Sequence, residues 1–244
     1  MSNDNLSMTA TLETKAPKIL AKSGSYTARI IKFYNLGLQK QEWQGEILPD
    51  KYVFSVHLEI QKQKHVFSKE KGEQMQSIKK DMIFSNLKLS KIADSKAHFS
   101  KMLLALGGEE KYQKLSNEIQ LKAGDDNDLV TKLLNEYITE NDTCMISIIH
   151  NKSKSSDEIY ANIASFFEIP EGMNLDKREN PLSIFDWSKN INTFYEMPKW
   201  IQEKVKESKN WKLGNYKIKE EKQETETETL PPISVDDLAP TMPF

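Results

Sequence analysis

The chain has 244 residues, with 34 lysine and arginine residues against 36 aspartate and glutamate residues and a net charge of −2. Its apolar runs are all shorter than the roughly 20 residues that a membrane-spanning helix needs, and its N-terminal segment has no apolar stretch typical of a signal peptide. The single cysteine, Cys144, excludes a disulfide framework, which favours a reducing cytoplasm. Cys144 lies in an apolar run and is expected to be a buried packing residue rather than a catalytic thiol.

Five segments have the composition of β-strands: 24–35, 51–61, 81–89, 143–149 and 159–169. The second alternates cleanly, with Phe54, Val56 and Leu58 on one face and polar residues such as His57 on the other. This alternation predicts a half-buried antiparallel strand whose polar face, including His57, contacts solvent. The segments 35–50, 61–80 and 150–158 are polar and are predicted to be loops.

Two helices are predicted between the third and fourth strands. The first follows Ser95 as a cap and ends at Gly107-Gly108, and the second covers 127–138. Five short strands with helices between the third and fourth is the order of an oligonucleotide-binding (OB) barrel. We therefore expect a mainly β protein of the α+β class, with a five-stranded OB-type barrel.

The rest of the chain flanks this barrel. We expect a flexible segment at 1–22, the barrel domain at 23–170, a helical appendage at 171–218 and a disordered tail at 219–244. The appendage contains a predicted amphipathic helix after Pro198. Its tryptophans are expected to anchor it to the barrel; they are Trp187, Trp200 and Trp211.

The tail carries seven acidic side chains and two lysines, a net charge of −5, which leaves +3 for the remaining 218 residues. A basic body joined to an acidic string is typical of a nucleic-acid-binding protein with an interaction tail. Its glutamate-rich composition offers too little apolar area to fold. An acidic tail that only improves solubility is the alternative.

The end of the tail combines carboxylates with a small apolar tip, which suits a partner pocket that has an apolar slot and a cation. The sequence DDLAPTMPF resembles the acidic tip, ending in Pro-Phe, of bacterial and phage single-stranded DNA-binding proteins. It has fewer aspartates than is usual in that family and four residues between Leu238 and Pro243. The resemblance implies that the tip binds replication or recombination proteins. The implied partner-binding residues are Asp236, Asp237, Leu238, Pro243 and Phe244.

Three segments of the body resemble phage-encoded single-stranded DNA-binding proteins with an OB-type barrel: GSYTARIIKFYNLGLQKQEWQGE, SNLKLSKIADSKAHFSKMLLALGG and PKWIQEKVKESKNW. These patches fall within 24–212. The resemblance implies a protein of the host bacterial cytoplasm that has no catalytic residues and no cofactor, acts in replication, recombination or repair, and forms homo-oligomers in some cases.

Single-strand binding needs cations along the phosphates and aromatic faces for the bases. On an OB barrel the groove crosses strands 2 and 3 and is flanked by the loops that join strands 1–2 and 4–5. Trp43, in a polar loop, is the favoured stacking residue, and Tyr34 is a weaker candidate. The candidate cations are Arg29, Lys32, Lys40, Lys51, Lys62, Lys64, Lys79, Lys80, Lys88, Lys91, Lys152 and Lys154.

Other chemistries have weaker support. The sequence contains no GxxxxGK[ST] motif, and its four histidines lack partners at zinc spacing, so neither nucleotide hydrolysis nor a zinc site is expected. Acidic clusters such as Asp125-Asp126 fit solvated turns better than a metal-dependent nuclease. Two further alternatives remain open, namely a virion structural or assembly protein and an RNA-binding protein.

Overall fold

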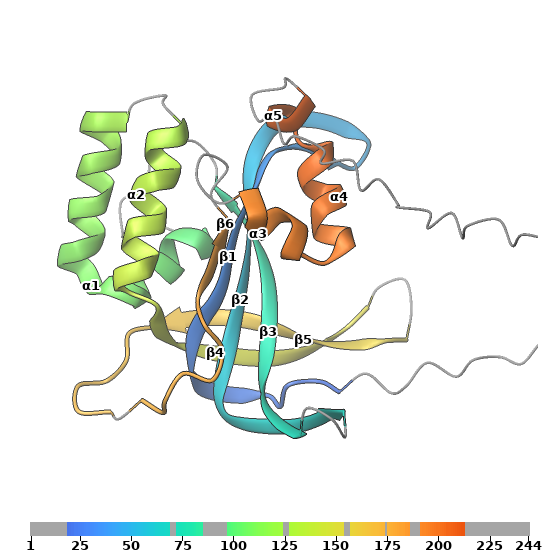
Figure 1. Cartoon of the computed structure of the whole chain (residues 1–244), viewed down its shortest axis with the longest axis vertical. Coiled ribbons are helices and arrows are strands. Elements are labelled where there is room, and N and C mark those ends of the chain that lie inside the picture. Colours follow the sequence, from blue (N-terminus) through green and yellow to red (C-terminus); the bar gives the residue numbers. More distant parts are fainter. Residues whose placement is uncertain are drawn as a thin grey trace, which may run out of the picture.

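The structure is a computed structural model that describes residues 19–68, 72–84, 97–123, 127–153, 157–173, 175–185 and 191–212. It is mainly an antiparallel β-sheet, curled into a half-barrel, with a few helices (Figure 1). The strands are β1 (Gly24–Trp43), β2 (Glu46–Ser68), β3 (Gly72–Phe84), β4 (Thr143–Lys152), β5 (Ile159–Phe167) and the short β6 (Ser183–Phe185).

The five long strands lie in the order β3-β2-β1-β4-β5, and all neighbours in this order are antiparallel. The first half of β1 pairs with β4 on one edge and with β2 on the other. Further along, β6 takes the edge that β4 leaves and pairs parallel with Lys32–Tyr34 of β1. The pair β4–β5 crosses β1–β3 steeply in Figure 1, which shows how strongly the sheet is curled.

Two of the predicted loops are strand. The segment 35–50 contains the end of β1, a turn at Gln44-Gly45 and the start of β2, while most of 61–80 belongs to β2 and β3. The third strand therefore begins at Gly72 rather than at 81. Both segments look like loops because polar side chains, such as those of Gln61, Gln63 and Gln76, take buried strand positions there, so no apolar alternation marks the strands.

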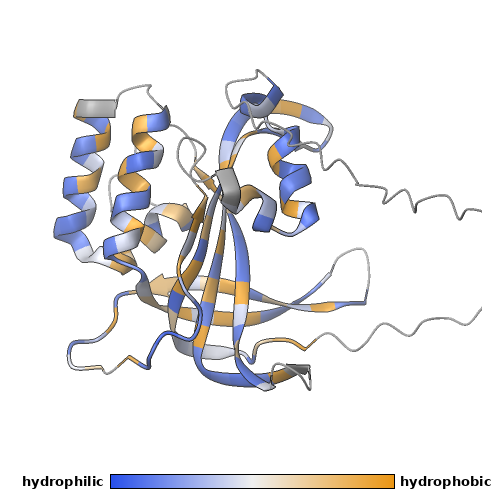
Figure 2. Ribbon diagram, in the orientation of Figure 1, coloured by the Kyte–Doolittle hydropathy of each residue, from blue (hydrophilic) through white to orange (hydrophobic). Residues whose placement is uncertain are grey.

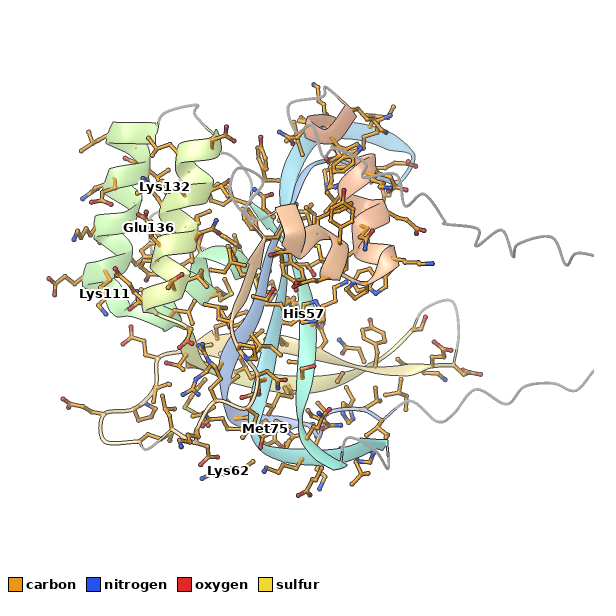
Figure 3. All side chains as sticks on the ribbon, viewed as in Figure 1. His57, Lys62, Met75, Lys111, Lys132 and Glu136 are labelled. Carbon is orange, nitrogen blue, oxygen red and sulfur yellow. The ribbon has the colours of Figure 1, made fainter. Side chains whose placement is uncertain are left out.

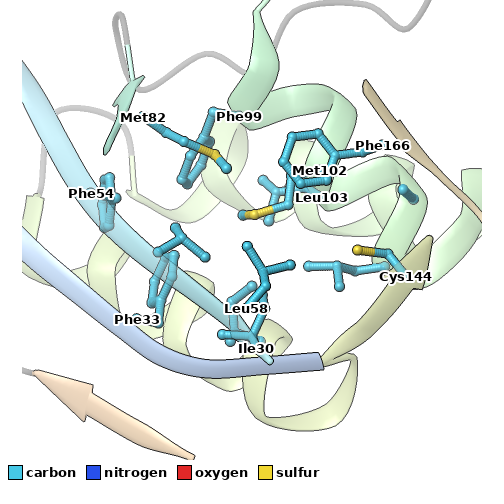
Figure 4. Packing of buried hydrophobic residues seen from close by; sticks show 14 of the residues in the cluster. Ile30, Phe33, Phe54, Leu58, Met82, Phe99, Met102, Leu103, Cys144 and Phe166 are labelled. Atoms are coloured by element: carbon cyan, nitrogen blue, oxygen red, sulfur yellow. The ribbon is translucent and has the colours of Figure 1, made fainter. Parts of the chain in front are cut away.

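The main core lies inside the curl of the sheet and is closed by α1 (His98–Glu118) and α2 (Asn127–Glu140). The apolar face of β2 predicted by alternation is fully buried there, with Phe54 stacked on Phe33 at a ring distance of 5.1 Å. Phe99 of α1 packs against Phe54 at 5.0 Å. Figure 4 shows these rings together with Met82, Met102 and Leu58.

The helix α1 departs from the prediction at its end. Gly108 leaves the helical region (φ 74°, ψ 176°), but the helix resumes to Glu118 and continues as a π-helical turn, η2 (Ile119–Ala123). Tyr112 and Leu115 extend its buried side beyond the predicted end at Gly107-Gly108. Ser95, the predicted cap, lies outside the described residues.

The C-terminal helices α3 (Ile191–Glu196), α4 (Lys199–Glu207) and α5 (Lys209–Lys212) lie on the side of β1–β2 away from α1 and α2 (Figure 1). The helix predicted after Pro198 is α4, and its apolar residues Ile201 and Val205 are buried. Among the described residues, no helix is long and apolar enough to cross a membrane. Figure 2 shows apolar residues gathered where helices and strands meet and polar ones along the outer sides of the helices.

Gly37 lets α4 and α5 approach β1 closely. Its φ of 80° lies in the left-handed region, and a Cβ there would lie 2.8 Å from Cβ of Ser208. Next to it, the Leu38 amide donates to Oδ1 of Asn210 at 2.7 Å, and Nε2 of Gln39 donates to the Lys204 carbonyl oxygen at 2.8 Å. The bulge between Asn35 and Leu38 therefore serves as the docking point of the C-terminal helices.

Candidate nucleic-acid interface

The outer face of the sheet, the face turned away from the main core, is covered over β1 and β2 by the end of the chain. A second apolar cluster forms there between β1, β6, α3 and α4, with Val53 of β2 and Trp211 of α5 at its margin. It consists of Tyr34, Leu36, Phe185, Phe194, Met197, Ile201 and Val205. The C-terminal segment is thus packed on the sheet through a core of its own.

A strap formed by residues 175–185 covers the adjoining part of β2. The Glu59 carboxylate accepts hydrogen bonds from the Asn180 amide nitrogen at 3.0 Å and from Nδ2 of Asn180 at 2.6 Å. Lys64 pairs with Glu179 at 2.8 Å, and Arg178 pairs with Asp142. Polar residues of β2 that alternation assigns to solvent are therefore buried under this strap, and Glu59 has no exposed surface.

This covering removes part of the outer face as a candidate binding surface. Tyr34, one of the two predicted stacking residues, is 3% exposed and shares a hydrogen bond of 3.2 Å with the Ser183 hydroxyl, so its ring offers no face to a base. Burial also raises the pKa of Tyr34. His57 is half-buried rather than solvated, because the C-terminal helices lie above it (Figure 3).

The outer face of β3 remains partly open. Lys79 lies on it with its side chain 30% exposed, next to Asp81, whose carboxylate lies 3.1 Å from Nζ of Lys79. From α4, Nζ of Lys204 approaches the other carboxylate oxygen at 2.9 Å. Trp200, one turn earlier on α4, is 41% exposed, and Nζ of Lys79 lies 3.8 Å from the centroid of its ring.

These four residues form what we call the Trp200 cluster: Lys79, Asp81, Trp200 and Lys204. Burial lowers the pKa of Lys79, although the Asp81 carboxylate opposes this shift. Burial acts to raise the pKa of Asp81, but hydrogen bonds from groups that include both lysines bring it below its usual value. The carboxylate is therefore ionised at neutral pH, and both its oxygens face ammonium groups.

His57 lies beneath this cluster, opposite Lys79 on the neighbouring strand. Burial lowers its pKa to about 4, and the positive charges of Lys32 and Lys79 act in the same direction. His57 is consequently neutral at pH 7, and the positive charge of the surface comes from lysines alone. Lys32, Lys79 and Lys204 outnumber Asp81 here, so the patch attracts anions.

The other predicted cations that the structure describes lie away from this patch. Lys40 is exposed and Lys51 is half-buried on the β1–β2 ribbon, while Lys62 lies at a bulge near the far end of β2 (Figure 3). Lys152 pairs with Asp157 at 2.6 Å on the β4–β5 hairpin. Arg29 is half-buried on β1, between β2 and β4.

Lys80 has a structural role, because it joins two strands. Its ammonium group donates to the Ile163 carbonyl oxygen at 2.5 Å and to Oδ1 of Asn162 at 3.2 Å, which ties β3 to β5 across the seam of the curled sheet. Burial lowers the pKa of Lys80. Several candidates lie outside what the structure describes: Lys88, Lys91, Lys154, the side chain of Trp43, and the tail residues Asp236, Asp237, Leu238, Pro243 and Phe244.

The sequence pattern predicts an anchoring role for Trp200 and indicates no role for Lys204. A usable signal was present, because Ile201 and Val205 form the buried stripe of α4 at a spacing of four residues. Trp200 and Lys204 have the same spacing one residue earlier. They therefore lie together at the margin of the stripe, where a side chain meets both the sheet and solvent.

No protein-family model matches the sequence, and no curated protein matches it significantly. In the part of the chain that the structure describes, no group of three or more His, Cys, Asp or Glu side chains is arranged to hold a metal ion. The residues of the interface are thus the basis for assigning a function.

Proposed function

We propose that the chain is a single-stranded DNA-binding protein built on an OB-type barrel. Three features of the topology support the barrel assignment: β1 is shared between β2 and β4, the helices α1 and α2 lie between β3 and β4 in the chain, and Lys80 closes the seam from β3 to β5. A fold does not determine a function, which has to be argued from the surface.

The observation that best supports this function is that two ammonium groups, of Lys79 and Lys204, lie next to the exposed indole of Trp200. They do so on the part of the outer face of β3 that remains partly open. Phosphate contacts supply affinity without regard to sequence. Stacking adds about 1–3 kcal/mol per base and tolerates any base, since every base has a π-face. A surface with both elements suits an unpaired strand, whose bases are free to stack, and implies little sequence preference.

The acidic tail, 219–244, has two proposed roles. Its tip recruits replication or recombination proteins, and its carboxylates compete with DNA for the basic surface. The competition follows from opposite charges on one chain, −5 on the tail and +3 on the rest. Deletion of 219–244 should raise DNA affinity, most strongly at low salt. An unchanged affinity would show that the tail does not compete.

The test of the function is a titration of a dye-labelled poly-dT oligonucleotide, followed by anisotropy at low and moderate salt, with tryptophan emission recorded in parallel. We expect binding that weakens steeply with salt and quenches tryptophan. Absence of binding at low salt would reject the proposal and favour a structural role in a virion. A poly-rU oligonucleotide and a duplex of equal length serve as controls, and loss of intact strand with Mg²⁺ but not with chelator would indicate a nuclease.

A further inference from the structure

The Trp200 cluster has a carboxylate where a ligand phosphate would be expected. Asp81 lies between two ammonium groups at 3.1 and 2.9 Å, distances typical of a charge-assisted contact. We propose that this cluster is a subsite for one nucleotide, in which the base stacks on Trp200 and the adjoining phosphate takes Lys79 and Lys204 from Asp81. This inference rests on the proposed function and concerns how that surface is regulated.

The ring of Trp200 lies beside both ammonium groups and is still 41% exposed. Nζ of Lys79 lies 3.8 Å and Nζ of Lys204 5.8 Å from the ring centroid. A base that stacks on the exposed part of the ring would form an arrangement of ammonium, indole and base. Such an arrangement gains both a cation–π contact and stacking.

An ion pair that only docks α4 would be the simplest alternative. That task is already performed by Ile201 and Val205, which have no exposed surface, and by the hydrogen bond from Gln39 to the Lys204 carbonyl oxygen. Docking also gives no reason for a tryptophan to stay 41% exposed on top of the ion pair. A ligand that covers the indole and neutralises the lysines accounts for both features.

Asp81 then limits the affinity of the site. In the free protein its carboxylate orients both ammonium groups, and in the complex it lies beside an incoming phosphate and repels it. Lys32 and the neutral His57 surround the same spot, so the local balance stays positive even with Asp81 ionised. The site therefore still attracts a phosphate, but less strongly than its lysines alone would.

The experiment measures affinity of the full-length protein for a labelled dT oligonucleotide by anisotropy. Trp200→Ala should weaken binding about 5- to 100-fold, since it removes one stacked base. Asp81→Asn should tighten binding at low salt by about 2- to 5-fold, the scale of one partly exposed charge interaction. Lys204→Gln should weaken binding and lower the salt dependence by about one phosphate contact. Lys206→Gln removes the same charge from an exposed position of α4 and is the matched control.

The double variant Asp81→Asn/Lys204→Gln separates competition from a general charge effect. If Asp81 acts by occupying the lysines, most of the gain from Asp81→Asn should disappear when Lys204 is absent. If Asp81→Asn raises the DNA affinity equally in the wild-type and Lys204→Gln backgrounds, Asp81 does not compete with the phosphate for Lys204. Weaker DNA binding by a folded Asp81→Asn protein would also reject the competition. Thermal unfolding checks the fold of each variant; if Asp81→Asn does not fold, Trp200→Ala, altered at an exposed ring, decides whether the subsite exists.

The two proposals fail in different ways. If the wild-type protein binds the oligonucleotide and Trp200→Ala binds equally well, the subsite is rejected and the function stands. If the wild-type protein does not bind, the function and the subsite are both rejected. Loss of part of the tryptophan quenching in Trp200→Phe, with affinity reduced less than in Trp200→Ala, would further support a stacked base at this residue.

Discussion

Nδ2 of Asn180 donates a hydrogen bond of 2.6 Å to the buried carboxylate of Glu59, across 121 positions of the chain. The same carboxylate also accepts hydrogen bonds from the backbone amide of Asn180, at 3.0 Å, and from that of Glu179, at 3.4 Å. Glu59 is thus one of the residues of β2 that hold the strap on the outer face, together with Gln61 and Lys64. Its side chain accepts three hydrogen bonds while it has no exposed surface, so every one of its contacts is made within the protein.

Glu59→Gln should therefore release the strap. An amide in place of the carboxylate turns an NH₂ group toward N–H donors and leaves buried polar groups unpaired, at a cost of about 1–3 kcal/mol. We expect lower global stability in urea and faster hydrogen exchange of the amides of β6 and of residues 179–180. Glu203→Gln, at an exposed position of α4, is the control. Unchanged exchange in 179–185 would show that Glu59 does not hold the strap.

His57 should make stability depend on pH. Its pKa of about 4 in the folded protein lies below the ordinary value of 6.5, so the unfolded state binds the proton first as pH falls. The contribution of the neutral histidine is complete above pH 6.5, is lost progressively down to about pH 4, and amounts to on the order of 3 kcal/mol.

The measurement is the free energy of unfolding in urea at several pH values for the wild-type protein and for His57→Leu. Carboxylates titrate in the same range and affect both proteins alike, so the difference between the two curves isolates the histidine. The wild-type protein should lose more stability than His57→Leu between pH 6.5 and 4. Parallel curves would mean that His57 is not protected from protonation.

Gly107 should tolerate no side chain. A Cβ at this position would lie 2.2 Å from the hydroxyl oxygen of Tyr137 on α2, and that hydroxyl is fixed because it donates to the Leu103 carbonyl oxygen at 2.7 Å. Gly107→Ala should destabilise the protein by about 1–3 kcal/mol, the usual cost of overpacking. In a Tyr137→Phe background the penalty should be smaller, because the closest atom is gone. An equal penalty in both backgrounds would place the cause elsewhere.

Much of the inner architecture follows from local patterns. The alternation of β2, the apolar spacing of Phe99, Met102 and Leu103, and the helix after Pro198 are all confirmed. Each of these elements buries an apolar face in one of the two cores, and such burial leaves a periodic trace in the sequence. The strands within 35–50 and 61–80 are not predicted because several of their buried positions hold polar residues, such as Asn35, Gln61 and Gln76, which break the apolar alternation.

The candidate site could be predicted only in part. Lys79 was identified as a cation, but its partners Trp200 and Lys204 come from a segment more than 100 residues away and are placed by the second apolar cluster. The same packing removes Tyr34 from the surface, and the strap 175–185 buries Glu59. A polar face that is covered by a distant part of its own chain has the same alternation as one in water, so its sequence does not reveal the covering.

Cys144 offers a probe of how the sheet opens. It lies on β4 between β1 and β5 with no exposed surface, and burial raises the pKa of its thiol to about 12. Because the thiolate is the nucleophile, a thiol reagent at pH 8 should label the native protein only through opening of the core.

We expect negligible labelling in buffer and rapid labelling in denaturing urea, measured by absorbance of the released chromophore. A Cys144→Ala/Ser77→Cys protein, with its thiol on the exposed part of β3, should react at once. Fast labelling of native Cys144 would show that β4 separates from its neighbours far more often than a strand at the centre of a core should.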